Sequence, residues 1–135
     1  HLTADELKLC HLVRDADKLD IFTVLDDAIA TNYLETHPEV YWGLPLAAPV
    51  SPRMVEAIRL GESIDYAEIK SFADFVLIQV AWCHGGLYFK TSSQLVIERD
   101  EVGIRERYLC GLIPLEAKTI QQCCEIARKA LVEHQ

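Results

Sequence analysis

The sequence lacks long hydrophobic runs, a signal peptide and any stretch rich in one kind of residue. No apolar run approaches the roughly 18 residues that a membrane-spanning helix needs, and the first residues do not resemble an export signal. We therefore expect no membrane partner and a cytoplasmic location. Half of the residues are hydrophobic and a quarter are charged, which is ordinary for a globular domain.

Metal-binding or disulfide-forming cysteine patterns are also missing. The five cysteines are an odd number, and no Cys-x-x-Cys motif occurs among them. This argues against a disulfide framework and against a zinc ribbon. Free thiols in a reducing compartment are expected instead. The neighbours Cys123 and Cys124 are expected to be small residues at the edge of a helical core.

Clustered basic residues are scarce as well. The net charge is −8, and residues 1–35 carry eight acidic against three basic residues, whereas residues 101–135 carry five of each. A nucleic-acid polymer is therefore not expected as a partner, because phosphate contacts need clustered Lys and Arg. The acidic excess of the N-terminal part would attract a cation instead.

Helical patterns fill most of the chain. Thr3 and Glu6 have the spacing of a capping box, and apolar residues then recur every three or four positions up to about Tyr33 or Leu34. This predicts a long first helix with a broad apolar face. A proline-containing loop follows, in which Tyr41 and Trp42 are expected to pack over the helices.

The rest of the chain predicts further helices. Ser51 has the position of an N-cap, and Asp65 with Glu68 repeats the capping pattern before a strongly apolar segment. The expected helices after the loop cover residues 52–60, 67–84, 91–99, 101–112 and 114 onward. The sequence thus predicts one all-α domain, residues 1–135, of about five to six helices.

The candidate metal-binding and phosphate-binding residues lie in the stretch RDADKLDIF, residues 14–22. Successive helical residues turn by about 100°, so Asp15 and Asp17 point to nearly opposite sides. Asp17 lies four residues from both Val13 and Ile21, at the edge of the apolar stripe, and a partly buried carboxylate there must be paired, hydrogen-bonded or metal-bound. Asp15 is then expected to face water.

Two neighbours of Asp17 suit a phosphate site. Asp20 lies one turn further along the helix, and Lys18 projects beside Asp17 and could act as a point charge for a phosphate oxygen. On spacing alone, the more common outcome for three acids and a lysine is a solvated helix face with charge pairs. Spacing therefore leaves both alternatives open.

The residues of this stretch also resemble a motif of a known family. ADKL, residues 16–19, resembles the last motif of the HD-domain superfamily of metal-dependent phosphohydrolases, in which its aspartate is a metal ligand. The segments SPRMVEAIRLGESIDYAEIKSFADFVLIQVAW and YFKTSSQLVIERD resemble the helical C-terminal half of bacterial proteins of this kind. The resemblance implies that Asp17 binds a divalent metal (Mg, Mn or Fe), with Lys18 and Asp20 beside the metal or substrate. His84 occupies about the place where related proteins have an aspartate.

The family pattern is incomplete here. Its other ligands are a histidine and an adjacent His-Asp pair, whereas only sixteen residues precede Asp17 and no His-Asp dipeptide occurs. The resemblance implies that this is the C-terminal part of a longer enzyme that hydrolyses a phosphorylated small molecule or nucleotide. One carboxylate holds such a metal poorly, so we expect the chain alone to be inactive.

A different class of function stays open beside the enzyme. The chain could be a helical interaction or dimerisation module without chemistry, in which case Asp15, Asp17 and Asp20 would all be exposed. A helical segment separated from its packing partners also exposes apolar surface. Self-association into a homo-oligomer is therefore expected.

Overall fold

The computed structural model describes residues 1–41 and 43–135, and in them it is all-helical, with 74% helix and no strand. This confirms the predicted all-α fold. The side chain of Tyr41 and the whole of Trp42 lie outside the described part, so their expected packing stays a prediction. The helices are α1 (Ala4–Ala30), α2 (Tyr33–Thr36), α3 (Pro52–Leu60), α4 (Phe72–Trp82), α5 (Lys90–Glu98), α6 (Glu101–Leu112) and α7 (Ala117–Glu133).

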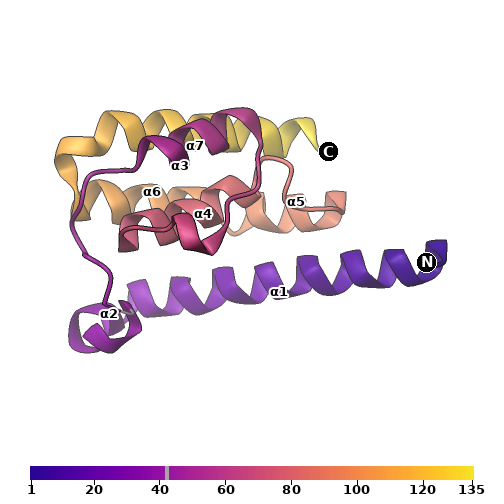
Figure 1. The fold of residues 1–135 in the computed structure, drawn as a ribbon, viewed down its shortest axis with the longest axis horizontal. Coiled ribbons are helices and arrows are strands. Elements are labelled where there is room, and N and C mark those ends of the chain that lie inside the picture. Colours follow the sequence, from indigo (N-terminus) through magenta and orange to yellow (C-terminus); the bar gives the residue numbers. More distant parts are fainter. Residues whose placement is uncertain (42) are drawn as a thin grey trace.

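Helix α4 lies at the centre of this arrangement. Nine of its eleven residues are buried, as expected of a helix that other helices surround, and it contacts α3, α6 and α7. Helix α1 runs along one side of the bundle, and its N-terminal end projects past the other helices (Figure 1). The buried residues of α4 are Phe72, Ala73, Asp74, Val76, Leu77, Ile78, Gln79, Val80 and Ala81.

The predicted start of α1 is confirmed and its predicted end is wrong. The Thr3 hydroxyl accepts the Glu6 backbone N–H, and Glu6 in turn accepts the Thr3 N–H. The helix ends at Ala30 because Asn32 takes the left-handed conformation, with φ 54°, and separates α1 from the short α2.

Helix α4 is shorter than the predicted span of 67–84. The capping box of Asp65 and Glu68 is present, but it caps a short 3₁₀ turn that ends before the backbone becomes extended at Ile69. A second cap then starts α4, since the Ser71 hydroxyl accepts the backbone N–H of Asp74. Two local capping signals therefore stand where one helix was predicted.

Asp74 also changes the expected role of Ser51. The Ser51 hydroxyl does not cap α3; it donates a 2.6 Å hydrogen bond to the buried carboxylate of Asp74, which also accepts the Lys70 N–H. A polar contact thus joins the starts of α3 and α4.

Cys123 and Cys124 of α7 are buried, in agreement with the small core residues that the sequence predicts. Burial raises the pKa of the Cys123 thiol to about 11.

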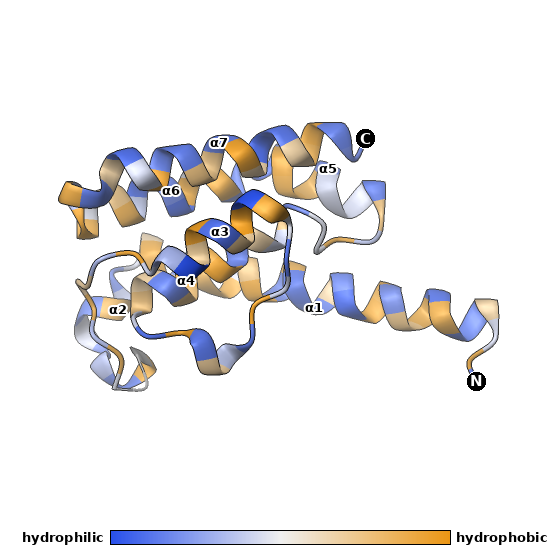
Figure 2. Ribbon diagram, turned by 45° about the horizontal axis from the view of Figure 1, so that its top comes forward, coloured by the Kyte–Doolittle hydropathy of each residue, from blue (hydrophilic) through white to orange (hydrophobic). Residues whose placement is uncertain are grey.

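The broad apolar face predicted for α1 is only partly buried against the other helices. Phe22 and Leu25 are its buried apolar residues, and they lie in the C-terminal half of the helix. Figure 2 shows further hydrophobic residues along the projecting N-terminal half. The apolar face of α1 is therefore buried in the C-terminal half and largely exposed in the N-terminal half. The large apolar residues of α1 that are exposed are Leu7, Leu9, Leu12, Val13 and Val24.

A polar cluster holds the C-terminal half of α1 on the bundle. The Arg105 side chain of α6 is fully buried. Its Nε donates to Gln79 of α4 at 2.7 Å, and its Nη1 donates to both Asp26 and Glu101 at 2.8 Å. Its Nη2 donates to the backbone oxygen of Phe22 at 3.0 Å. One side chain thereby connects α1, α4 and α6, a contact that the sequence patterns do not indicate.

We predict that Arg105→Met strongly destabilises the fold. The substitution leaves Asp26 and Glu101 beside each other without a cation, and breaking such a buried pair costs about 3–5 kcal/mol. Urea-induced unfolding followed by circular dichroism measures the loss. Arg99→Met is the matched control because Arg99 is exposed, and it should change the free energy of unfolding by no more than about 0.5 kcal/mol. Equal effects of the two substitutions would contradict this account.

Candidate functional site

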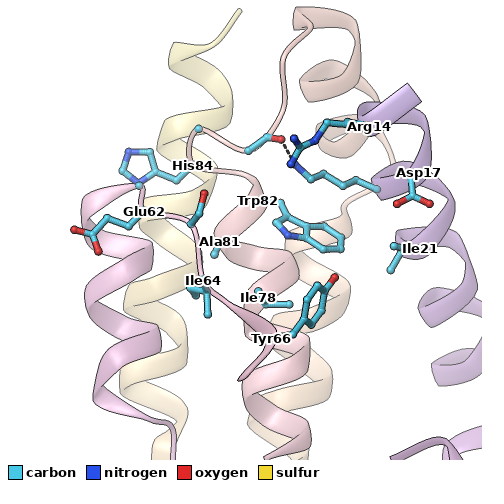
Figure 3. Close-up of a pocket in the computed structure, with 15 residues that line it drawn as sticks. Arg14, Asp17, Ile21, Glu62, Ile64, Tyr66, Ile78, Ala81, Trp82 and His84 are labelled. Atoms are coloured by element: carbon cyan, nitrogen blue, oxygen red, sulfur yellow. Dashed lines mark hydrogen bonds between the residues drawn. The ribbon is translucent and has the colours of Figure 1, made fainter. Parts of the chain in front are cut away.

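A pocket of about 270 Å³ lies between α1, the connection from α3 to α4, and the turn that follows α4. Of the site residues predicted from the sequence, it brings together Asp17, Lys18 and His84, whereas Asp20 lies elsewhere on the exposed surface of α1. Figure 3 shows Arg14 extending from α1 toward the turn, above Trp82. The residues that line the pocket are Arg14, Asp17, Lys18, Ile21, Gly61, Glu62, Ser63, Ile64, Tyr66, Ile78, Ala81, Trp82, His84, Gly85 and Gly86.

Lys18 of α1 contacts the turn that follows α4. Its Nζ donates a hydrogen bond to the backbone oxygen of Gly86 and lies 5.8 Å from the Trp82 ring centroid and 6.0 Å from that of Tyr88. Burial lowers the pKa of Lys18, and the nearby positive charge of Arg14 lowers it further. An ammonium has three N–H donors, so Lys18 keeps donors for a ligand beside Gly86.

The charges around the pocket favour an anion. Glu62 lines the pocket, but its carboxylate forms an ion pair with Arg53 at 2.7 Å. Arg14 has no ion pair among the described residues, and its guanidinium carbon lies 6.0 Å from the Tyr88 ring. Arg14 and Lys18 therefore face the pocket with Asp17 as the one carboxylate of its lining that is not in a described ion pair.

Two glycines allow the tight backbone turn that follows α4. Gly85 has φ +85°, a conformation that other residues rarely adopt. A Cβ on Gly86 would lie 2.6 Å from the backbone oxygen of Trp82, which is too close for any side chain. Glycine at both positions thus lets the chain turn back so that the Gly86 carbonyl meets Lys18.

His84 has a positioning role in this turn. Its Nδ1 lies 2.7 Å from the backbone oxygen of Ile58, near the end of α3. A carbonyl oxygen only accepts, so Nδ1 carries the hydrogen. This bond satisfies one of the carbonyls that the last turn of a helix leaves without a partner. The ring also packs against Gly61, where a Cβ would approach Nε2 to 3.2 Å.

The structure reverses the expected environments of the first two aspartates. Asp15, predicted to face water, is buried with 1% exposure, whereas Asp17, predicted to be partly buried, is exposed. The prediction took Val13 and Ile21 to mark the buried side of α1. Val13 is 66% exposed, so the buried side is turned away from it.

Asp15 is the acidic residue that sequence analysis misplaced, and its role is structural. Its carboxylate accepts the backbone N–H groups of Tyr88 and Phe89 at 3.0 Å and the Ser92 hydroxyl at 2.6 Å. Phe89 precedes α5 and has no side chain that could cap it. Asp15 instead holds the backbone that leads into α5 from a distant part of the chain, where a negative charge also suits the positive end of the helix.

The described residues do not fit a metal ion. They contain no group of three or more His, Cys, Asp or Glu side chains that could hold one. Divalent cations such as Mg²⁺ need several oxygen or nitrogen ligands in a fixed arrangement. Among the described residues, Asp17 belongs to no such group. The assignment of Asp17 as a ligand therefore stays a prediction that requires ligands from elsewhere.

Comparison with protein-family models, with curated proteins and with solved structures finds no match to this chain. In the described part, each helix is too short or too polar to cross a membrane.

We predict that Asp15 matters for stability and that Asp17 does not. Asp15→Ala leaves the N–H groups of Tyr88 and Phe89 without an acceptor, which costs about 1–3 kcal/mol. Asp17→Ala, on the same helix, should change the free energy of unfolding by less than about 0.5 kcal/mol because Asp17 is exposed. Urea denaturation of both variants measures the difference. A larger loss for Asp17→Ala would contradict the assigned roles.

Proposed function

We propose that this chain binds the phosphate group of a phosphorylated small molecule, such as a nucleotide, in the pocket between α1 and the turn after α4. The observation that carries the proposal is the pair of cations at the pocket. Arg14 and Lys18 lie one helical turn apart on α1, so both can reach the same anion. The carboxylate of Glu62 does not compete with that anion, because it is paired with Arg53.

The two cations would bind a phosphate in different ways. A guanidinium offers a planar pair of N–H groups that matches two phosphate oxygens, whereas an ammonium acts as a compact point charge. The lowered pKa of Lys18 reflects burial beside Arg14, and an anion placed between them would relieve that repulsion.

The remaining walls of the pocket suit a small organic group. Trp82 and Tyr66 contribute aromatic surface beside the cations, and such rings pack well against flat apolar groups. The volume of about 270 Å³ is near the lower limit of small-molecule sites, which is about 300 Å³. This favours a phosphorylated small molecule over a polymer.

The resemblance of ADKL to the HD superfamily extends this proposal to an enzyme. Asp17 at the pocket would be one ligand of a divalent metal (Mg, Mn or Fe) in a phosphohydrolase, and the missing histidine and His-Asp ligands would come from residues that this sequence does not contain. We expect the 135-residue chain to bind phosphate without hydrolysing its esters. A cytoplasmic location, which the free thiols favour, belongs to the same proposal.

The binding proposal predicts that Arg14→Gln and Lys18→Gln each weaken the binding of adenosine monophosphate about tenfold, because each removes one charge-assisted contact worth about 1.4 kcal/mol. Isothermal titration calorimetry at low salt measures the dissociation constants. Arg99→Gln and Lys129→Gln remove the same charges from exposed positions outside the pocket and should leave binding unchanged. Equal weakening by all four variants would indicate non-specific attraction and contradict the site.

A second candidate function, an interaction module, is favoured by the exposed side chains of α1. Leu9, Leu12 and Val13 are 55–66% exposed on the part of the helix that projects from the bundle (Figure 1). Contiguous apolar surface of this kind marks interaction sites. We propose that α1 of a second copy covers these residues and forms a homodimer.

The dimer proposal predicts a dimer for the unmodified chain in sedimentation velocity at tens of micromolar. Leu12→Glu should give monomers, because it places a charge in the contact. Val132→Glu is the control, since Val132 is 63% exposed on α7 and should leave the dimer intact. A monomer at all concentrations, or equal disruption by the control, would contradict the proposed contact.

A further inference from the structure

The buried cluster of Asp26, Glu101 and Arg105 contains more negative than positive charge. Both carboxylates bind the same nitrogen, Nη1 of Arg105, at 2.8 Å. If both carboxyl groups were ionised, two negative charges would face one positive charge where burial makes an uncompensated charge costly.

The hydrogen bonds of this cluster also leave one oxygen unexplained. The Oε1 atom of Glu101 is buried and has no donor, whereas Oε2 accepts from Arg105. The carboxyl groups of Glu101 and Asp26 meet at the same guanidinium nitrogen, and two ionised carboxylates have no hydrogen to place between them. A proton on Glu101 supplies that hydrogen and makes the cluster neutral.

We propose that Asp26 and Glu101 share one proton at neutral pH, and that this proton keeps α1 bound to α4 and α6. Glu101 holds it, because its side chain is 1% exposed, whereas that of Asp26 is 21% exposed and keeps contact with water. Loss of the proton at higher pH leaves a buried negative charge on the contact between the helices.

The neighbouring groups are consistent with this assignment. Burial, followed by the contact with Asp26, raises the pKa of Glu101 to about 7, although Arg105 acts in the opposite direction. Gln79 of α4 is uncharged and binds Arg105. Cys83, just after α4, is influenced by the charges of Arg105 and Glu101, and burial raises the pKa of its thiol to about 12, so it stays neutral throughout this range.

The direction of the pH effect follows from the two states. The carboxyl of Glu101 has an ordinary pKa of 4.5 and a folded-state pKa of about 7. Between these values the folded chain holds a proton that the unfolded chain has lost, so the contribution to stability falls as pH rises and levels off above about 7. The same linkage predicts that transient opening of α1 becomes about tenfold more frequent between pH 6 and pH 8.

Amide hydrogen exchange of the 135-residue chain, followed by NMR at pH 6 and pH 8, tests this proposal. After correction for the intrinsic exchange rate, protection of the amides of residues 18–28 should fall about tenfold in the unmodified chain. Glu101→Gln keeps the hydrogen-bonding shape without a titrating proton and should show no such fall. Glu125→Gln, at an exposed position on α7, should behave like the unmodified chain. A flat profile in the unmodified chain, or an unchanged fall in Glu101→Gln, would overturn the proposal.

A direct titration of the unmodified chain does not depend on whether any variant folds. The side-chain carboxyl ¹³C signal of Glu101 in the unmodified chain should titrate with a midpoint near 7, and a midpoint near 4.5 would overturn the shared proton. Asp26→Asn separates sharing from burial alone, because it leaves one carboxylate for Arg105 and should lower that midpoint. A midpoint that stays near 7 in this variant would overturn the role of Asp26.

Discussion

The guanidinium of Arg105 is fully buried between α1, α4 and α6 and donates hydrogen bonds to residues of all three helices. Helix α1 has 27 residues but buries only Phe22 and Leu25 as apolar side chains. Leu19, Ala28 and Ile29 pack against the core as half-buried residues, and polar contacts add to this packing in placing the helix. Arg105 fixes the C-terminal half of α1, while Asp15 fixes the middle by its hydrogen bonds to Phe89 and Ser92 at the start of α5.

The pocket depends on this placement. With α1 held at Asp15 and at Asp26, the helix presents Arg14 and Lys18 to the loop after α4, where Lys18 reaches the carbonyl of Gly86. The same constraint has a cost, because a buried ion pair rarely improves stability over an apolar contact. The hydrogen bonds of Arg105 are directional, however, and they fix the rotation and register of α1, a helix with few buried apolar residues.

Local features of the fold could be predicted from the sequence, and the environment of the site could not. The capping box of Thr3 and the span of α6 depend on neighbouring residues, and both are found as predicted. The assignment of Asp15 and Asp17 failed because α1 carries apolar residues on several sides, so the pattern does not reveal which side is buried. The contact of Lys18 with Gly86 spans 68 residues, a separation at which no sequence pattern gives a signal.

The central claim is that the cations of α1 and the glycine turn after α4 form one anion site. Titration of the ¹⁵N-labelled chain with inorganic phosphate, followed residue by residue by NMR, tests it most directly, because it needs no substitution. The account predicts that the amide signals of Lys18, Gly85 and Gly86 shift together with one dissociation constant. Shifts confined to exposed basic residues outside the pocket, such as Arg99 and Lys129, would contradict it.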